Sequence, residues 1–481
     1  MTVGGRSQVG GFSRVVGGTS VGGRARVGGR DPIDFSEMRP YQRQGSQLIR
    51  SRERFLLGDS PGLGKSVQWL RALPSRPHAI MLCPASVLSV WEEQAERWRP
   101  DIVVDTESSL RMPDEGELVC VSHDSLPPPM RSPRGVWRLL PEPARHVWLG
   151  IDEGHRFKNP DAQRTQRARL LRKECGRCTM LTGTPMVGTP EDLWGVLVTL
   201  GVAHEVFPGG WDELVELCQG KQKYAWNVKL KCKVKAGWEW GNVSPEVRER
   251  LKAVMLRRTA DEVGVQLPPV QLIDRPVAAP DDLRDYLDEV ERDAWADVAP
   301  NELPPFELLQ RALSLLAESR VEATLEWVEE HAADHQVLVF SAHLAPILAV
   351  GAMRGVGPVG VLVGSTPEAE RKPIVRDFQA GRTRVLAMTL KTGGVGLNLQ
   401  MASAGLFVDR SYSPDENLQA LRRFVRSGSV HKSVIVARMT SDHPLDRRLS
   451  EILDTKERNI ADAVGAEEGF VATVGKKRRK R

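Results

Sequence analysis

The sequence predicts an α/β protein with two doubly wound parallel-sheet lobes and a mainly helical insertion between them. Two series of short apolar runs, each ending in polar or turn residues, lie before Leu200 and after Glu307. Such runs are typical of buried parallel strands that carry functional residues at their carboxyl ends. Helical patterns accompany the runs, and the stretch between the two series lacks this alternation. We therefore expect lobes at 36–203 and 306–465 and an insertion at 204–305.

The first lobe is expected to place a glycine-rich loop and a pair of acids at the ends of its strands. Its strands are predicted at Phe55–Gly58, Ala79–Pro84, Val147–Glu153 and Thr179–Pro185. Val87–Trp98 has the pattern of an amphipathic helix between two of these strands.

The insertion and the second lobe are predicted to be richer in helix. Asp281–Trp295 reads as a helix with Leu283, Leu287, Val290 and Ala294 on one face. A further helix is expected around Glu307–His331. The strands of the second lobe are then predicted at Val337–Ser341, Val359–Val363, Arg384–Thr389 and Gly405–Asp409.

Composition sets limits on the class of protein. No apolar run approaches the roughly 18 residues of a membrane span, so no membrane partner is expected. Six cysteines in 481 residues do not make a disulfide framework, which favours reduced thiols in a cytoplasm. The net charge of +5 is too small to indicate a nucleic-acid partner by itself.

Both ends of the chain are basic. Residues 1–35 contain five V-G-G triplets with interspersed arginines, and 466–481 end in K-K-R-R-K-R. Paired glycines without an apolar face do not repay the entropy of ordering, so we expect a disordered tail at 1–35. Three interpretations of it stay open: a phosphate-binding tail, a passive tail, or a start codon assigned too far upstream. The basic tail at 466–481 is expected to bind phosphate backbone or to be solvated.

The loop after the first strand is a candidate phosphate site. Gly62 and Gly64 let backbone N–H groups approach an anion, and the helix that follows favours negative charge. Lys65 would neutralise phosphate oxygens, and the Ser66 hydroxyl would ligate Mg²⁺. Asp59 stands where the common phosphate-loop pattern has its first glycine, so an ordinary strand–turn–helix junction competes with this interpretation.

Two further groups suit the same chemistry. Asp152 and Glu153 end a strongly apolar strand, where Mg²⁺ would suit Asp152 and an attacking water would suit Glu153. The alternative is a helix N-cap followed by an acid in the first turn. Arg423 and Arg426 are three residues apart, which predicts one face of a helix. Most such pairs are solvated, but with a phosphate loop in the other lobe they fit arginine fingers.

Together, these motifs resemble the Swi/Snf-type ATPases of helicase superfamily 2, which are DEAD/DEAH-like. The resemblance covers most of Met38–Gly428. Its motifs are R-P-Y-Q-R-Q-G (39–45), D-S-P-G-L-G-K-S (59–66), C-P-A-S-V-L-S-V-W (83–91), D-E-G-H-R-F-K-N (152–159), L-T-G-T-P (181–185), L-R-R-T-A-D-E-V (256–263), T-G-G-V-G-L-N-L (392–399) and Q-A-L-R-R-F-V-R-S-G (419–428). It implies two RecA-like lobes of the P-loop NTPase type, ATP and Mg²⁺ as substrate and cofactor, and Gln42 and Gly396 among the nucleotide-binding residues. The family has Asp at the place of Asp59, which answers the objection to the phosphate loop.

The resemblance implies a DNA-stimulated ATPase that translocates along double-stranded DNA. Single-stranded DNA or RNA is a further potential partner, and the oligomeric state is left open. A strand-separating helicase and a nucleic-acid-binding scaffold without turnover are the alternatives. Ser60, Pro61, Val425 and Ser429 depart from the family motifs, which puts coupling rather than hydrolysis in doubt. The composition suggests a bacterial or phage protein, located in the cytoplasm near the nucleoid or in a host cytoplasm.

Two side signals remain. Cys175, Cys178, Cys218 and Cys232 would supply four thiolates for zinc, but Cys178 opens a predicted strand, which favours a place in the core. Asn227–Lys235 alternates apolar residues with Lys229, Lys231, Lys233 and Lys235, as expected of a strand with one basic face. That face is either solvated or a contact for DNA phosphates.

Overall fold

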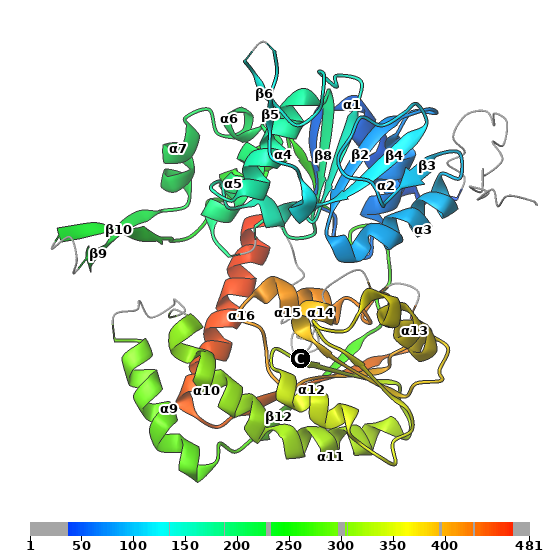
Figure 1. Ribbon diagram of the computed structural model, residues 1–481. Coiled ribbons are helices and arrows are strands. Elements are labelled where there is room, and N and C mark those ends of the chain that lie inside the picture. Colours follow the sequence, from blue (N-terminus) through cyan, green and yellow to red (C-terminus); the bar gives the residue numbers. More distant parts are fainter. Residues whose placement is uncertain are drawn as a thin grey trace, which may run out of the picture. The chain divides into compact units, whose positions relative to one another are not determined.

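The first lobe is built on a seven-stranded parallel sheet. The computed structural model describes residues 37–464 except 134, 187, 228–231, 297–303, 305, 394–396 and 427–428. The strands lie in the order β11 (Met255–Leu256), β1 (Arg54–Leu57), β8 (Arg177–Leu181), β7 (Trp148–Asp152), β2 (His78–Cys83), β4 (Glu117–Ser122) and β3 (Val103–Asp105). Their buried side chains contribute to two apolar clusters, and the helices of the lobe surround the sheet (Figure 1).

The helices of the first lobe follow its strands in the order expected of a doubly wound sheet. They are α1 (Pro40–Ser51), α2 (Lys65–Ala72), α3 (Leu88–Trp98), α4 (Gln163–Glu174), α5 (Pro190–Leu200), α6 (Ala203–Val206), α7 (Gly210–Leu217) and α8 (Pro245–Leu251). The start of α5 shows the local chemistry: Thr189 and Asp192 form a capping box, and Pro190 occupies the first turn. Gly201 ends the helix in the left-handed region at φ 90°.

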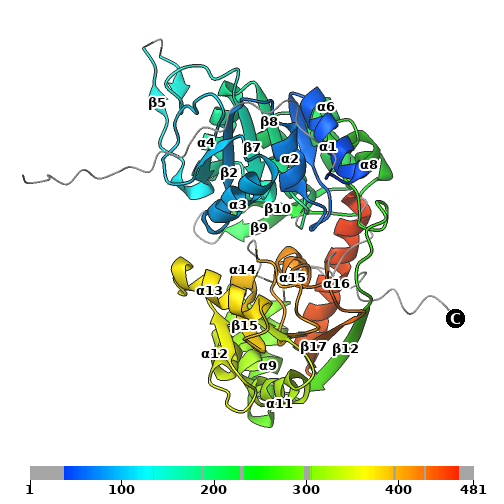
Figure 2. The same cartoon turned by 90° about the vertical axis from the view of Figure 1, so that its right-hand side faces the viewer.

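The second lobe contains a six-stranded parallel sheet (Figure 2). Its order is β12 (Val270–Val277), β17 (Val434–Ser441), β16 (Ala404–Phe407), β13 (Val337–Ser341), β15 (Val385–Thr389) and β14 (Val359–Leu362). Its helices are α9 (Asp281–Ala294), α10 (Phe306–Ser319), α11 (Val321–Ala332), α12 (Leu344–Gly351), α13 (Glu368–Gln379), α14 (Leu390–Gly393), α15 (Pro414–Leu421) and α16 (Pro444–Val464). The two parallel sheets confirm the predicted fold class.

The structure divides the predicted insertion at 204–305 differently from the sequence pattern. β11 pairs with β1 of the first sheet, and β12 pairs along its whole length with β17 of the second sheet. Leu214, Val247 and Leu251 belong to the apolar core of the first lobe. The face predicted for α9 packs with α10 and α16. Residues 204–305 therefore extend both lobes, because each lobe completes its sheet and its apolar core with part of this range.

The single helix predicted around Glu307–His331 is two helices, α10 and α11. They meet at Arg320, which is 3% exposed and has φ −91° and ψ 0°. Its guanidinium donates to the Val408 carbonyl at 3.0 Å and to Asp446 at 2.7 Å. These contacts stabilise the break between α10 and α11, because they bind Arg320 to two residues far along the chain.

Two short antiparallel hairpins accompany the parallel sheets. One pairs β5 (Met130–Arg131) with β6 (Trp137–Arg138), and the other pairs β9 (Lys221–Asn227) with β10 (Cys232–Glu239). Asn227 pairs with Cys232, so the single strand predicted over Asn227–Lys235 is wrong. Within the described ranges, no helix has both the length and the apolar character needed to cross a membrane.

Candidate active site

The loop between β1 and α2 has the backbone of a phosphate-binding turn. Gly62 and Gly64 have φ of 88° and 76°, in the left-handed region where glycine is strongly favoured. Lys65 begins α2, and its Nζ donates to the Asp59 carbonyl at 2.8 Å. Burial lowers the pKa of Lys65, although Glu153, Asp59 and Asp152 oppose this shift. Ser66 occupies the first turn of α2, beside Lys65.

Gln42 of α1 is packed against this loop. Its Nε2 donates to the Leu63 carbonyl at 3.2 Å, and its Oε1 accepts from the Arg39 N–H at 3.0 Å. A Cβ at Gly64 would lie 2.6 Å from the Gln42 Nε2, so glycine is needed there for space as well. The structure therefore brings Gln42 to the phosphate loop, while its contact with adenine stays a prediction.

Asp59 binds a residue that the sequence placed in the insertion. Its carboxylate accepts from Arg258 Nε at 3.0 Å and from Arg258 Nη2 at 2.5 Å, and Gln68 donates to it at 2.9 Å. Asp59 is fully buried and Arg258 is 9% exposed. This two-pronged pair fixes the start of the phosphate loop to the chain beyond β11. It explains why an acid replaces glycine here.

The acidic pair lies at the end of β7. Asp152 accepts from Trp91 Nε1 at 3.0 Å, and burial together with the charge of Glu153 raises the pKa of Asp152 to about 6. Burial raises the pKa of Glu153 too, but the charges of His155, Lys65 and Arg423 outweigh it and leave that pKa below its ordinary value. Glu153 has φ 48°, a strained conformation that is common at functional sites.

Gly154, beside the acidic pair, is a position where a larger residue does not fit. A Cβ at this position would lie 2.1 Å from the Met180 Cγ. Met180 of β8 is fully buried in the core of the first lobe. An alanine would therefore displace a core side chain.

His155 links the acidic pair to the second lobe. Its Nδ1 lies 3.1 Å from Thr182 Oγ1 and 3.4 Å from Glu153 Oε2, and its Nε2 lies 3.6 Å from Asp415 Oδ2. Asp415, in the first turn of α15, also accepts from Gln419 Nε2 at 2.7 Å. Sequence reasoning missed Asp415. The available signal was an acid just after Pro414 at the start of a helix, four residues before Gln419.

Arg423 and Arg426 lie beyond the end of α15, so the predicted helix face is wrong. The helix ends at Leu421, and the Arg423 carbonyl accepts from the Leu399 N–H at 3.0 Å instead of continuing the helix. Burial lowers the pKa of Arg423 to about 10, while Glu153, Asp415 and Asp152 oppose the shift. Arg423 is therefore close to the acids. Burial also lowers the pKa of Arg426, whose Nε has no hydrogen-bond partner among the described residues.

These residues fit a magnesium nucleotide. Asp152 and Glu153 are adjacent carboxylates at the end of β7, and burial with the charge of Glu153 raises the pKa of Asp152. Gly62 leaves open space where a side chain would stand. Lys65 of the first lobe and Arg423 of the second supply positive charge that acts on Glu153. Ser66 and Asp152 would hold Mg²⁺, and Lys65 would hold the phosphates.

Some predicted site residues fall outside this cluster. Gly396, Lys229 and Lys231 lie outside the described residues, and Lys233 belongs to β10. Lys235 is exposed in β10. Cys175, Cys178 and Cys218 are buried in the core of the first lobe, and burial raises the pKa of Cys178 to about 11. Such thiols behave as core side chains.

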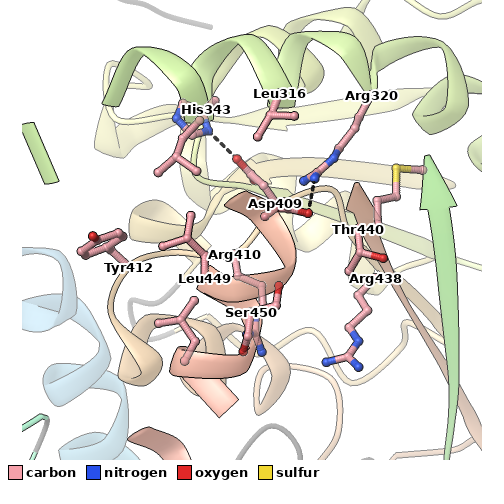
Figure 3. Close-up of a pocket in the computed structure, with 14 residues that line it drawn as sticks. Leu316, Arg320, His343, Asp409, Arg410, Tyr412, Arg438, Thr440, Leu449 and Ser450 are labelled. Carbon is pink, nitrogen blue, oxygen red and sulfur yellow. Dashed lines mark hydrogen bonds and ion pairs between the residues drawn. The ribbon is translucent and has the colours of Figure 1, made fainter. Parts of the chain in front are cut away.

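A pocket in the second lobe is separate from the predicted site (Figure 3). Arg320, His343, Asp409 and Arg410 line it, and His343 Nδ1 is hydrogen-bonded to Asp409. The Arg320–Asp446 pair and an Arg410–Asp454 pair at 2.6 Å join its walls to α16. Its charged groups are thus engaged in docking α16.

Comparison with known proteins supports this organisation. Residues 41–276 match the SNF2-related domain, and residues 319–428 match the helicase conserved C-terminal domain. The chain is 27% identical over 459 residues to the SWI/SNF-related matrix-associated actin-dependent regulator of chromatin subfamily A-like protein 1 homolog of Caenorhabditis elegans, covering 88% of this chain and 62% of the relative. It is 24% identical over 465 residues to the human DNA annealing helicase and endonuclease ZRANB3, covering 90% and 42%.

The chain thus spans less than two thirds of the length of these relatives. They are animal proteins, so they do not support a bacterial or phage origin. Among solved structures, the Sulfolobus solfataricus SWI2/SNF2 ATPase core in complex with dsDNA has 18% identity and a TM-score of 0.38, covering 90% of this chain and 94% of that one. The chain therefore combines an SNF2-related domain with a helicase conserved C-terminal domain, in that order along the sequence.

Proposed function

We propose that the chain is a DNA-stimulated ATPase that hydrolyses ATP between its two lobes and translocates along double-stranded DNA. One observation carries this proposal: His155 lies 3.4 Å from Glu153 of the first lobe and 3.6 Å from Asp415 of the second, where the charge of Arg423 also acts on Glu153. An ATPase that couples hydrolysis to lobe movement needs charge from the second lobe at the reacting phosphate.

The residues have distinct roles in this proposal. Lys65 and the backbone N–H groups near Gly62 and Gly64 hold the phosphates. Glu153 orients the attacking water and accepts its proton, and its lowered pKa keeps it ionised for this role. Arg423 and Arg426 stabilise the charge of the transferring phosphoryl group. Magnesium, when bound by Ser66 and Asp152, neutralises phosphate charge and orients the nucleotide.

Duplex DNA is the proposed partner. The human relative is by name a DNA annealing helicase, and the archaeal ATPase core was solved with double-stranded DNA. Lys229, Lys231, Lys233 and Lys235 are proposed to contact phosphates, because this run of lysines includes no acid. Readout of phosphates alone would be independent of sequence and sensitive to salt. We also propose a cytoplasmic location and a bacterial or phage source.

ATP turnover with blunt duplex DNA, single-stranded DNA and no DNA tests the proposal. We expect duplex DNA to stimulate turnover most, and we expect the protein to displace a third strand from a triplex without separating the duplex. Lys65→Ala is the control that should abolish both activities. Equal turnover with and without DNA would contradict the motor function, and separation of the duplex would favour a strand-separating helicase.

A further inference from the structure

The β9–β10 hairpin is a separate two-stranded sheet with a firmly packed base. Trp238 of β10 and Trp240, just beyond its end, have ring centroids 5.6 Å apart, and each meets Trp211 of α7 edge-on, at 5.5 and 5.7 Å. Trp211 in turn meets Trp194 of α5 at 5.8 Å. The base of the hairpin is therefore fixed to two helices of the first lobe. Figure 1 shows the strands extending away from α7.

The hairpin carries a concentrated positive charge. The fifteen residues from Lys221 to Lys235 include six lysines and no aspartate or glutamate. Lys235 is exposed, and Lys221 is exposed on the other face of the hairpin, opposite Glu239. Like charges along one short hairpin repel one another unless a polyanion neutralises them, so a polyanionic partner is complementary to this surface.

One face of the hairpin also presents an exposed aromatic ring. Tyr224 is 59% exposed and lies directly opposite Lys235, while Gln222, on the same face, lies opposite Trp238. This face therefore runs from the packed Trp211–Trp238 contact at the base to an exposed tyrosine beside a lysine. Contact with duplex phosphates needs no aromatic ring. Stacking on an unpaired base does, and lysines beside the ring suit the adjoining phosphates.

We propose that the hairpin binds unpaired nucleotides where they join a duplex, with Tyr224 stacked on a base and Lys235 against an adjoining phosphate. This proposal rests on the proposed function in taking nucleic acid as the partner. It makes forked DNA, rather than uninterrupted duplex, the preferred substrate. The lysines contribute to binding on both kinds of DNA, whereas the tyrosine distinguishes between them.

Fluorescence anisotropy of the full chain without ATP tests the proposal. The probes are a fork with two single-stranded arms and a blunt duplex of the same paired sequence. We expect Tyr224→Ala to weaken fork binding about five- to a hundredfold and to leave duplex binding nearly unchanged. Tyr224→Phe keeps the ring and should bind as the wild type does. Trp137→Ala is the matched control, because Trp137 is 56% exposed on the other hairpin.

A second readout reports stacking directly. 2-Aminopurine at the first unpaired position should be quenched by the wild type and by Tyr224→Phe but not by Tyr224→Ala, with thermal unfolding confirming that each variant is folded. Equal weakening on fork and duplex, or no weakening on either, would overturn the proposal. Preferential binding of an acidic polypeptide, rather than DNA, at Tyr224 would also overturn it. A different result would contradict the proposed function: DNA would bind, but neither fork nor duplex DNA would stimulate ATP turnover.

Discussion

The two lobes contribute to the candidate active site in different ways. In the first lobe, hydrogen bonds of the chain already hold the functional side chains: Lys65 to a carbonyl, Asp152 to Trp91, and Gln42 to the phosphate loop. In the second lobe, Arg423 and Arg426 follow the end of a helix, and the Arg426 Nε has no partner among the described residues. The first lobe is thus organised for the nucleotide, and the second supplies positive charge from the chain beyond α15.

The difference shows where an enzyme of this kind can be rigid and where it must move. A binding site gains from preorganised groups, because their cost is met during folding. A group that acts only in the transition state gains more from arriving with the movement of its lobe.

The largest effect is expected at Glu153. Glu153→Gln should bind ATP normally and lower kcat by about 10⁴-fold, because the amide does not accept the proton of the attacking water. Lys65→Ala should instead weaken ATP binding itself. Equilibrium binding of a fluorescent ATP analogue, beside steady-state turnover, separates the two effects. Appreciable hydrolysis by Glu153→Gln would assign the base to another residue.

Arg426→Ala should lower kcat by about 10³-fold with little change in ATP affinity, because its charge acts on the transition state. Arg426→Lys should not restore turnover, since a compact ammonium does not replace the planar guanidinium. Single-turnover measurements at saturating ATP give the rate of the chemical step. Turnover at the wild-type rate in Arg426→Ala would remove it from the site and leave Arg423 as the charge supplied by the second lobe.

Each lobe also contains one buried arginine–aspartate pair, and removing either arginine should destabilise its lobe. Arg258→Met and Arg320→Met should each cost about 3–5 kcal/mol in the free energy of unfolding, because each leaves a buried carboxylate without its partner. Only Arg258→Met should also weaken ATP binding, since Asp59 begins the phosphate loop. Urea unfolding and nucleotide binding of both variants provide the measurement. An equal effect of both variants on ATP binding would contradict the assignment of Arg320 to the docking of α16.

The sequence predicted the strands that carry the site more successfully than the rest of the fold. β7, β8 and β13 are long apolar runs with polar residues at their ends, and their periodicity is sufficient to identify them. β11 has two residues, and β12 alternates between half-buried and exposed residues, so neither gives an apolar run. Both are strands because of their neighbours in the sheets.

The candidate site shows the same division. Lys65, Asp152 and Glu153 follow strands directly, and local pattern locates them. Arg258 and Asp415 reach the site only through tertiary contacts. Arg258 binds Asp59, which is 199 residues away in the sequence, and Asp415 lies 3.6 Å from His155. No local pattern encodes such a distance. The end of α15 before Arg423 depends likewise on the Leu399 N–H, which binds a carbonyl that a longer helix would use.

The smallest effect concerns pH and a buried histidine of the first lobe. His123 follows β4, is 1% exposed and packs edge-on against Phe157 at 4.7 Å. Burial lowers the pKa of His123 to about 4, below the value near 6.5 in an unfolded chain. The unfolded state therefore takes up a proton as the pH falls below about 6.5, and the folded state does so only near pH 4. The contribution of neutral His123 to stability is fully present above pH 7 and is lost as the pH falls between these values.

Between pH 7 and 5 the free energy of unfolding should fall by about 2 kcal/mol from this residue alone. Urea unfolding of the wild type and His123→Leu at both pH values measures it, because the difference between the two proteins cancels the other titrating groups. An identical fall in both proteins would show that His123 does not cause the acid sensitivity of the first lobe.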